Sequence, residues 1–328
     1  MAINTKAIKN RIKSVTNTKK ITKAMEMVSA SKMRKSVEAA LNTRTYATMA
    51  RDLLIHLSQV EEGSKYELLA TRPVKNILVV LVSSNRGLCG SFNANIFRKT
   101  IKALQNKNEL AKHILSDGKE ILPEADIKVS ILGIGKKSMS LAKREGYELV
   151  QIFEDINGNE DFEKVVSVSK NFIKDFKENK YDKVVVAYTD YKSSLNQVPK
   201  LRQLLPVSSY DLDKMLDELG RDIDSVSQQT KEEIKDGTVD FDANAYIFEP
   251  NENEIVEYVL PKLVEVQLFQ AILESSASEH SARMMAMRNA SDAARDMIEE
   301  LNLTFNKARQ ASITQEIAEI AGGAAALE

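Results

Sequence analysis

The fold of this chain is decided by residues 275–327, SSASEHSARMMAMRNASDAARDMIEELNLTFNKARQASITQEIAEIAGGAAAL. Small and apolar residues recur there in alternating steps of three and four, a spacing typical of a coiled-coil seam. The seam positions are Ala277, His280, Met284, Met287, Ser291, Ala294, Ile298, Leu301, Phe305, Ala308 and Ser312. Neither glycine nor proline occurs between Pro261 and Gly322, which predicts a helix of about 60 residues and roughly 90 Å. Such a helix cannot bury its own seam and needs a partner helix.

The amino-terminal end supplies a second long helix, because residues 6–60 contain no glycine and no proline. Its apolar residues form four runs at helical spacing: Ile8, Ile12 and Val15; Ile21, Met25 and Val28; Val37 and Leu41; and Met49, Leu53, Leu57 and Val60. Lys19 and Thr22 fall where the first run should continue. Each run therefore starts out of phase with the one before, and we expect stutters in the supercoil. The two terminal helices predict an antiparallel coiled coil formed within one chain.

Between residues 72 and 206 the pattern changes to short strands that alternate with helices. The apolar run NILVVLVS at 76–83 is typical of a buried central strand. Further strands are predicted at 128–134, 149–153, 183–189 and 197–207, with helices at 94–107, 137–144 and 162–178. This βαβ series predicts an open α/β domain with a mainly parallel sheet. We expect helices at 1–60 and 251–328, the α/β domain at 72–208, and an acidic insertion and linker at 209–250.

Composition and charge limit the classes of protein to which this chain can belong. The chain of 328 residues has one cysteine, Cys89, so it forms no internal disulfide and indicates a reducing compartment. There is no run of 18 apolar residues, and the basic amphipathic start continues as a helix, so we predict neither a membrane span nor a cleaved signal. Residues 1–45 carry about +9, from eleven Lys or Arg against two acidic residues, and residues 209–257 about −11, from fifteen acidic against four basic. We therefore expect different partners at the two places.

Patterns typical of nucleotide binding or catalysis are incomplete. The loop SNRGLCG at 84–90 lies where a phosphate would bind, but it lacks both common glycine spacings, and GIGKKS at 133–138 starts one without finishing it. The three histidines, His56, His113 and His280, are too scattered to activate Cys89, and no zinc spacing occurs. We predict no catalytic residue, no bound metal and no cofactor.

Five segments carry a resemblance to a known family. They are IKNRIKSVTNTKKITKAMEMVSASKMRK at 8–35, SNRGLCG at 84–90, QVPKLRQLLP at 197–206, EHSARMMAMRNAS at 279–291 and FNKARQASITQEIAEIAGGA at 305–324. In this order they resemble the gamma subunit of F-type ATP synthase. The resemblance covers the chain except residues 61–71, about 109–126 and about 210–243.

The resemblance implies a rotor shaft that catalyses nothing itself. Its terminal helices would pass through a hexamer of alternating alpha and beta subunits, with its α/β domain beside the epsilon subunit and the c-ring. The complex would lie peripherally on the cytoplasmic face of the bacterial inner membrane, with its nucleotide sites on alpha and beta. By motif, Lys19, Lys20, Lys23 and Met25 would lie opposite the mobile acidic loop of beta. Arg309, Gln310, Thr314 and Glu316 would contact beta near the upper shaft, and Arg283 would lie lower on the same helix.

Other interpretations stay open. The heptads also suit an interaction protein with an intermolecular coiled coil, and the basic first helix suits a nucleic-acid binder, although it lacks interleaved aromatic residues. The amphipathic pattern at 212–223 predicts a helix that either packs on the α/β domain or brakes rotation. The end AGGAAAL at 321–327 is either a tip that turns inside an apolar sleeve or a frayed terminus.

Overall fold

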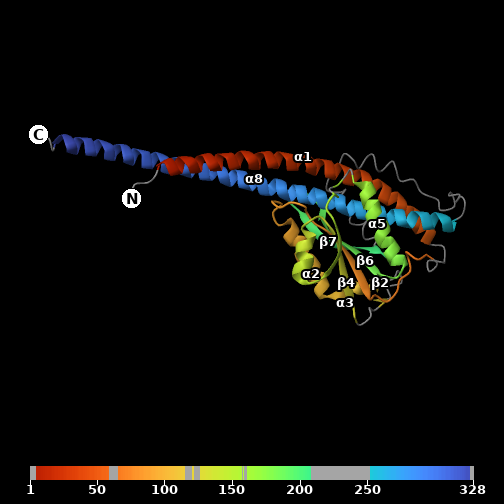
Figure 1. The fold of residues 1–328 in the computed structure, drawn as a ribbon. Coiled ribbons are helices and arrows are strands. Elements are labelled where there is room, and N and C mark those ends of the chain that lie inside the picture. Colours follow the sequence, from red (N-terminus) through yellow and green to blue (C-terminus); the bar gives the residue numbers. More distant parts are fainter. Residues whose placement is uncertain are drawn as a thin grey trace. The chain divides into compact units, whose positions relative to one another are not determined.

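The computed structural model describes residues 5–58, 66–114, 120–121, 126–156, 158, 161–207 and 252–325. The chain divides into two compact units, one made of residues 1–31 and 282–328 and the other of residues 32–281. Two long helices contribute to both units: α1 covers Thr5–Ser58 and α8 covers Glu252–Ala325 (Figure 1). The acidic stretch 209–250 and the helix predicted at 212–223 lie outside the described residues.

The first unit pairs the beginning of α1 with the end of α8 as an antiparallel coiled coil (Figure 1). On α8 the seam predicted from the sequence is confirmed from Met287 to Ala308. Its residues are buried or partly buried: Met287, Ser291, Ala294, Ile298, Leu301, Phe305 and Ala308. The last predicted position, Ser312, is exposed. The paired part of the seam therefore ends at Ala308.

The stutters predicted in α1 are wrong, because the buried face keeps one unbroken alternation. Buried or partly buried residues follow each other as Ile8, Ile12, Val15, Lys19, Thr22, Glu26 and Ser29. Ile21 and Val28, which the apolar pattern assigned to the seam, are 61% and 58% exposed. Thr22 is buried at low cost because its hydroxyl donates to the carbonyl oxygen of Lys19 at 3.1 Å. The register of α1 is thus continued by the small polar residues Thr22 and Ser29, where the apolar pattern would have placed Ile21 and Val28.

The second unit is built on a five-stranded sheet in the order β5–β4–β1–β6–β7. The strands are β1 Asn76–Val82, β4 Lys128–Ile134, β5 Glu148–Phe153, β6 Lys183–Tyr191 and β7 Gln197–Leu205. Neighbouring strands from β5 to β6 are parallel, and β7 is antiparallel to β6. The chain from β6 to β7 is short enough for a hairpin, which only antiparallel strands can form. The predicted α/β class with a mainly parallel sheet is confirmed.

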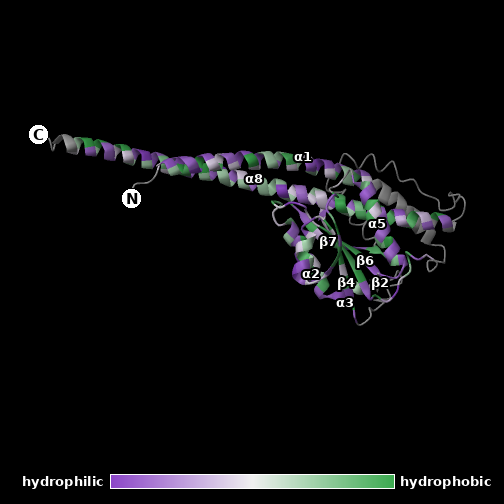
Figure 2. Ribbon diagram, in the orientation of Figure 1, coloured by the Kyte–Doolittle hydropathy of each residue, from purple (hydrophilic) through white to green (hydrophobic). Residues whose placement is uncertain are grey.

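Helices cover both faces of this sheet, so it forms the middle of three layers (Figure 1). The short helices are α2 Phe92–Gln105, α3 Lys107–Ala111, α4 Ser138–Glu145 and α5 Phe162–Lys177. Helices α2 and α4 pack on one face, and α5, part of α8 and Ala40 of α1 pack on the other. A small pair of strands, β2 His113–Ile114 and β3 Glu120–Ile121, is separate from the main sheet. In Figure 2 the strands are mostly hydrophobic, whereas the long helices mix both kinds of residue.

Helix α8 extends beyond the stretch between Pro261 and Gly322 that is free of proline and glycine. It has 74 residues, begins before Pro261 and continues through Gly322. A proline inside a helix removes one hydrogen bond and normally bends or ends the helix. Here its neighbours Leu260, Leu263 and Val264 are 1% exposed or less within the apolar core. Their burial outweighs the lost hydrogen bond and keeps the helix continuous.

Candidate functional site

Four residues that the resemblance singled out lie on α1 in the first unit. Lys20 and Lys23 are exposed, and Lys19 and Met25 are partly buried. The ammonium group of Lys23 donates to both carboxylate oxygens of Glu26, at 3.1 and 3.0 Å. The Lys23 side chain is 57% exposed, whereas that of Glu26 is 16% exposed. The exposed ammonium group of Lys23 can therefore also meet a carboxylate of another protein while it stays beside Glu26.

The same stretch of α1 carries exposed apolar residues, two of which, Ile21 and Val28, the sequence pattern placed in the seam. Ile21, Met27 and Val28 are 61%, 60% and 58% exposed. At 100° per residue they share the outer face of the helix with Lys20 and Lys23, and we call these five residues the outer patch. Exposed apolar groups beside lysines suit a partner surface that is both acidic and apolar. The sequence did contain a signal for these exposed positions. Thr22 and Ser29, rather than Ile21 and Val28, continue the alternating four- and three-residue spacing of the buried face.

The remaining predicted residues lie on the end of α8. Every described side chain from residue 309 to 322 is exposed, including Arg309, Gln310, Thr314 and Glu316. We call residues 309–322 the terminal segment. It carries Ile313, Ile317 and Ile320, which are 47%, 62% and 74% exposed and fall on one helical face. No residue among those the structure describes covers this face. An uncovered apolar face of this kind suits contact with a partner surface.

Arg283 differs from the other predicted contact residues. It is 8% exposed, so its guanidinium group is not presented on the outside of this chain.

The predicted residues lie at two levels of the coiled coil. Thr5, the first described residue of α1, and Ala308, the last buried residue of α8, mark the same end of the paired seam. Met25 is 20 residues further along α1, or about 30 Å at 1.5 Å per residue. The terminal segment extends from Ala308 in the opposite direction. The structure therefore does not bring the two groups into one site.

The edge of the sheet where a nucleotide phosphate would bind is filled by the chain's own groups. The amide of Lys136 donates to the side-chain oxygen of Asn85 at 3.0 Å, and the amide of Lys137 donates to the carbonyl of Ser84 at 3.1 Å. These two amides lie just before α4, in the loop GIGKKS, and are occupied within the chain. Cys89 in the adjoining loop is 3% exposed, and its sulfur accepts from the side-chain amide of Asn93 at 3.3 Å. This edge is packed for loop stability.

In the described part of the chain, no group of three or more His, Cys, Asp or Glu residues is placed to hold a metal ion. None of the helices there combines the length and apolar character needed to cross a membrane.

Comparison with known proteins places this arrangement in a family. The model of the ATP synthase family matches residues 4–327. The ATP synthase gamma chain of Bordetella pertussis is 38% identical over 322 residues, which cover 98% of this chain and 99% of that one. The chain belongs to the ATP synthase gamma family. Gamma chains are thus similar to it along both long helices and the sheet.

Solved structures agree with this assignment. A chain in the central stalk and c-ring of the Tetrahymena thermophila mitochondrial ATP synthase is 26% identical to this gamma subunit, with a TM-score of 0.55 over 83% of this chain and 99% of that one. A chain of the Euglena gracilis mitochondrial ATP synthase, in a structure of its OSCP, F1 and c-ring, is 19% identical, with a TM-score of 0.60 over 98% of this chain and 94% of that one. At the lower identity the likeness shows the fold alone.

Within the second unit of gamma, the hairpin of β6 and β7 holds both long helices. Ser281 of α8 donates to the carbonyl of Ser194 at 2.9 Å, and Ser278 donates to the carbonyl of Thr189 at 3.2 Å. On the α1 side, the Tyr191 hydroxyl lies 3.8 Å from the sulfur of Met33. We call these contacts the hairpin anchor. They fix α1 and α8 to the same edge of the sheet.

The hairpin anchor is stiffened by a buried carboxylate. Asp190 of β6 is 4% exposed and pairs with Lys200 at 2.7 Å and Lys192 at 3.4 Å. Burial acts to raise the pKa of Asp190, but the hydrogen bond and charge of Lys200, with Lys192 and Arg202, outweigh burial and lower that pKa. Asp190 is thereby held in its charged form between two strands.

Proposed function

We propose that this gamma subunit is the central rotor shaft of an F-type ATP synthase. It couples ion-driven rotation of the membrane c-ring to conformational cycling of the catalytic beta subunits, for ATP synthesis or hydrolysis. One observation carries this proposal: the paired helices of the first unit close their seam within the chain and present unlike outer surfaces. A shaft can drive its neighbours through different conformations only if each rotary angle offers them a different contact energy.

The unlike surfaces are the outer patch and the terminal segment. The outer patch combines two lysines with Ile21, Met27 and Val28, which are at least 58% exposed. The terminal segment presents isoleucines on one face, and Arg309, Gln310, Thr314 and Glu316 flank them on the same side of the helix. We propose that Lys19, Lys20, Lys23 and Met25, together with the outer patch, contact the acidic loop of beta. Arg309, Gln310, Thr314 and Glu316 would contact beta at the upper shaft.

Arg283 is proposed in a different role from the other contact residues. Because its side chain is 8% exposed, a direct contact with beta would need that side chain to move outward. We propose that Arg283 acts within gamma, by fixing the shape of the shaft below the upper contacts.

Gamma itself is proposed to be non-catalytic. The amides of Lys136 and Lys137 already donate to Asn85 and Ser84, so they are not free to bind a phosphate. The nucleotide sites are proposed to lie on the alpha and beta subunits. The terminal helices would be enclosed by the hexamer of alpha and beta. The α/β domain would face the epsilon subunit and the c-ring, with the complex peripheral on the cytoplasmic face of the bacterial inner membrane.

Torque must pass between the sheet and the helices without bending their junction. The hairpin anchor supports this role, because it binds Met33 of α1 and Ser278 and Ser281 of α8 to neighbouring residues of one hairpin. The hydrogen bond between Ser36 and Ser276, at 3.2 Å, joins the two helices within the same unit. The junction would therefore turn as one body.

The alternative, an intermolecular coiled-coil protein, has less surface available to it. The seam from Met287 to Ala308 is already covered within the chain, so a second copy would have to use surfaces outside the seam, such as the outer patch or the terminal segment. A pull-down of the tagged full-length chain from native membranes decides between the two. The rotor proposal expects alpha and beta subunits in threefold molar excess over gamma. Recovery of a gamma homodimer without them would contradict it.

A further inference from the structure

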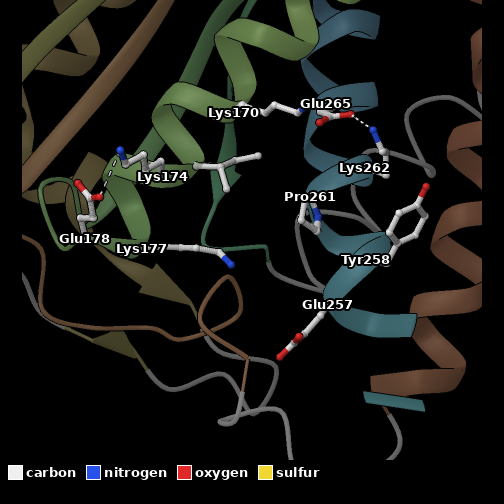
Figure 3. Close-up of a pocket in the computed structure, with 10 residues that line it drawn as sticks. Lys170, Lys174, Lys177, Glu178, Glu257, Tyr258, Pro261, Lys262 and Glu265 are labelled. Carbon is white, nitrogen blue, oxygen red and sulfur yellow. Dashed lines mark hydrogen bonds and ion pairs between the residues drawn. The ribbon is translucent and has the colours of Figure 1, made fainter. Parts of the chain in front are cut away.

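An open groove in the second unit lies between α5 and the first turns of α8 (Figure 3). Its volume is about 670 Å³. The α5 wall presents Lys170, Lys174 and Lys177, and Figure 3 draws Lys170 and Lys177 extending toward α8. The hairpin anchor, the outer patch and the terminal segment do not include any of these residues. The groove therefore lies outside the contacts proposed above.

The lysines of the α5 wall form one basic row. They are spaced by four and three residues, so they share a helical face, and all three are exposed. Lys174 lies 3.7 Å from Glu178 and Lys177 lies 3.5 Å from Glu67, with every one of these side chains at least 46% exposed. Long, exposed ion pairs of this kind are weak and easily replaced. The α5 wall can therefore accept further carboxylates.

The α8 wall adds an aromatic surface. Tyr258 is 71% exposed beside Pro261. Besides Glu178 at the end of α5, the groove has two acidic residues, Glu257 and Glu265, and both are on the α8 wall. Glu265 is already paired with Lys262 at 2.8 Å. An occupant that matches both walls needs carboxylates for α5 and aromatic or apolar side chains for Tyr258.

Residues 208–251 of this chain have that chemistry. They carry twelve Asp or Glu against four Lys or Arg, about −8, and they include Phe241, Tyr246, Ile247 and Phe248. Val207, which precedes them, belongs to the same apolar cluster as Ile173 of α5 and Leu260 of α8. The stretch rejoins α8 at Glu252, about 9 Å of helix from Tyr258. Both of its ends are therefore attached on the groove's side of the sheet.

We propose that the acidic segment 208–251 docks in this groove of its own chain. Its carboxylates pair with Lys170, Lys174 and Lys177, and its aromatic residues pack on Tyr258. Tethering at both ends gives the segment a local concentration in the millimolar range, so weak individual contacts suffice to keep it docked. The segment is then a fixed part of the α/β unit. This inference concerns the free full-length chain and does not depend on the rotor function.

Zero-length carbodiimide cross-linking of the full-length chain, followed by mass spectrometry of peptides, tests the proposal. We expect Lys170, Lys174 and Lys177 to link to Asp or Glu of 208–251 at least fivefold more than Lys99 and Lys102 do. Those two are exposed lysines of α2, which packs on the other face of the sheet. Yields should fall in 1 M salt, where charges are screened within about 3 Å. Equal linking from the α2 lysines would overturn the proposal.

A pair of variants checks the same contact without cross-linking. The triple variant K170E/K174E/K177E changes only exposed side chains, and K99E/K102E is its matched control. We expect limited proteolysis within 208–251 to become at least tenfold faster in the triple variant and to stay unchanged in the control. Mixing isotope-labelled and unlabelled chains shows whether the links lie within one chain. Links found only between two chains, or equal proteolysis of both variants, would contradict intramolecular docking.

Discussion

Close approach of two loops depends on a single glycine at the carboxyl edge of the sheet. Gly135 has φ of +90°, and a Cβ placed there would lie 2.1 Å from the backbone oxygen of Ser83. Both the backbone conformation and the space therefore require glycine. Its neighbours Lys136 and Lys137 then reach Asn85 and Ser84.

Gly135→Ala should destabilise the protein by about 2 kcal/mol or more, because it adds a backbone collision to the strain of positive φ. Gly146→Ala is the matched control, since Gly146 has φ of +72° with nothing within 4 Å of the added atom. The control should lose about 1 kcal/mol. Urea unfolding of the two variants measures the difference. Equal losses would show that the contact with Ser83 is unimportant.

At Asp190 the structure predicts a pH dependence. The pKa of this carboxyl is lower in the fold than its ordinary value of about 3.9. The contribution of the charged Asp190 to the free energy of unfolding is therefore present above about pH 4, and it is lost as pH falls through the lower pKa of the folded state. Asp190→Asn should cost about 2 kcal/mol at pH 7, because it leaves Lys200 and Lys192 without their carboxylate. We expect the difference from the parent protein in urea unfolding to shrink below pH 4.

An exposed ion pair supplies the control for that experiment. Asp175 pairs with Lys180 at 3.0 Å, but the two side chains are 27% and 54% exposed. Asp175→Asn should cost less than about 1 kcal/mol at any of these pH values. A constant deficit of Asp190→Asn from pH 7 down to pH 3 would disprove the proposed ionisation.

At the scale of the element, α1 has two faces with different tasks. Its inner face is set by small residues such as Thr22 and Ser29, which are 8% and 3% exposed, and its outer face carries apolar residues. Hydrophobicity alone assigned Ile21 and Val28 to the wrong face, although it placed the first apolar run, from Ile8 to Val15, correctly. Small residues allow close helix packing, and the displaced apolar residues remain available for other proteins.

Substitutions on the two faces of α1 should separate stability from coupling. Ile21→Ser with Val28→Ser should change the free energy of unfolding of the isolated chain by no more than about 0.5 kcal/mol. In the complex, the same double variant should reduce the coupling of ATP hydrolysis to ion pumping. Ser29→Leu places a large side chain in the seam and should cost about 1–3 kcal/mol. Calorimetry and proton or sodium pumping measure the two effects. The prediction would be wrong if Ile21→Ser with Val28→Ser destabilised the isolated chain and left the coupling intact.

The terminal segment of α8 should change its order on assembly. Because its described side chains are all exposed, we expect its amides to exchange hydrogen rapidly in the free chain. Enclosure by the hexamer should slow that exchange by at least 100-fold. Hydrogen exchange of the free and assembled chain measures this. Equal exchange in both states would exclude a surrounding sleeve.

For the whole molecule, sequence predicted those features that local pattern determines. The strands β1 and β4 were placed within a residue because each is a mainly apolar run, and six of its seven residues are buried. The seam of α8 followed from spacing alone. The groove, the hairpin anchor and the burial of Arg283 depend on contacts between residues distant in the chain, so no local pattern contained them.

Of the candidate site, sequence supplied the residues and the structure supplied their surroundings. The exposed positions of Lys20 and Lys23 agree with a contact role. The apolar outer patch was missed because apolar residues were assigned to the seam by type. The central proposal is that both chain ends turn together as one shaft.

A disulfide between the long helices tests that proposal most directly. Ser36 and Ser276 have their hydroxyl oxygens 3.2 Å apart, so Ser36→Cys with Ser276→Cys should form a disulfide within one chain. The measurement is ATP-driven rotation of single assembled complexes that carry the oxidised variant. Our account predicts rotation at the same rate before and after reduction. Rotation that stops on oxidation and returns on reduction would show that the helices must separate, and would contradict it.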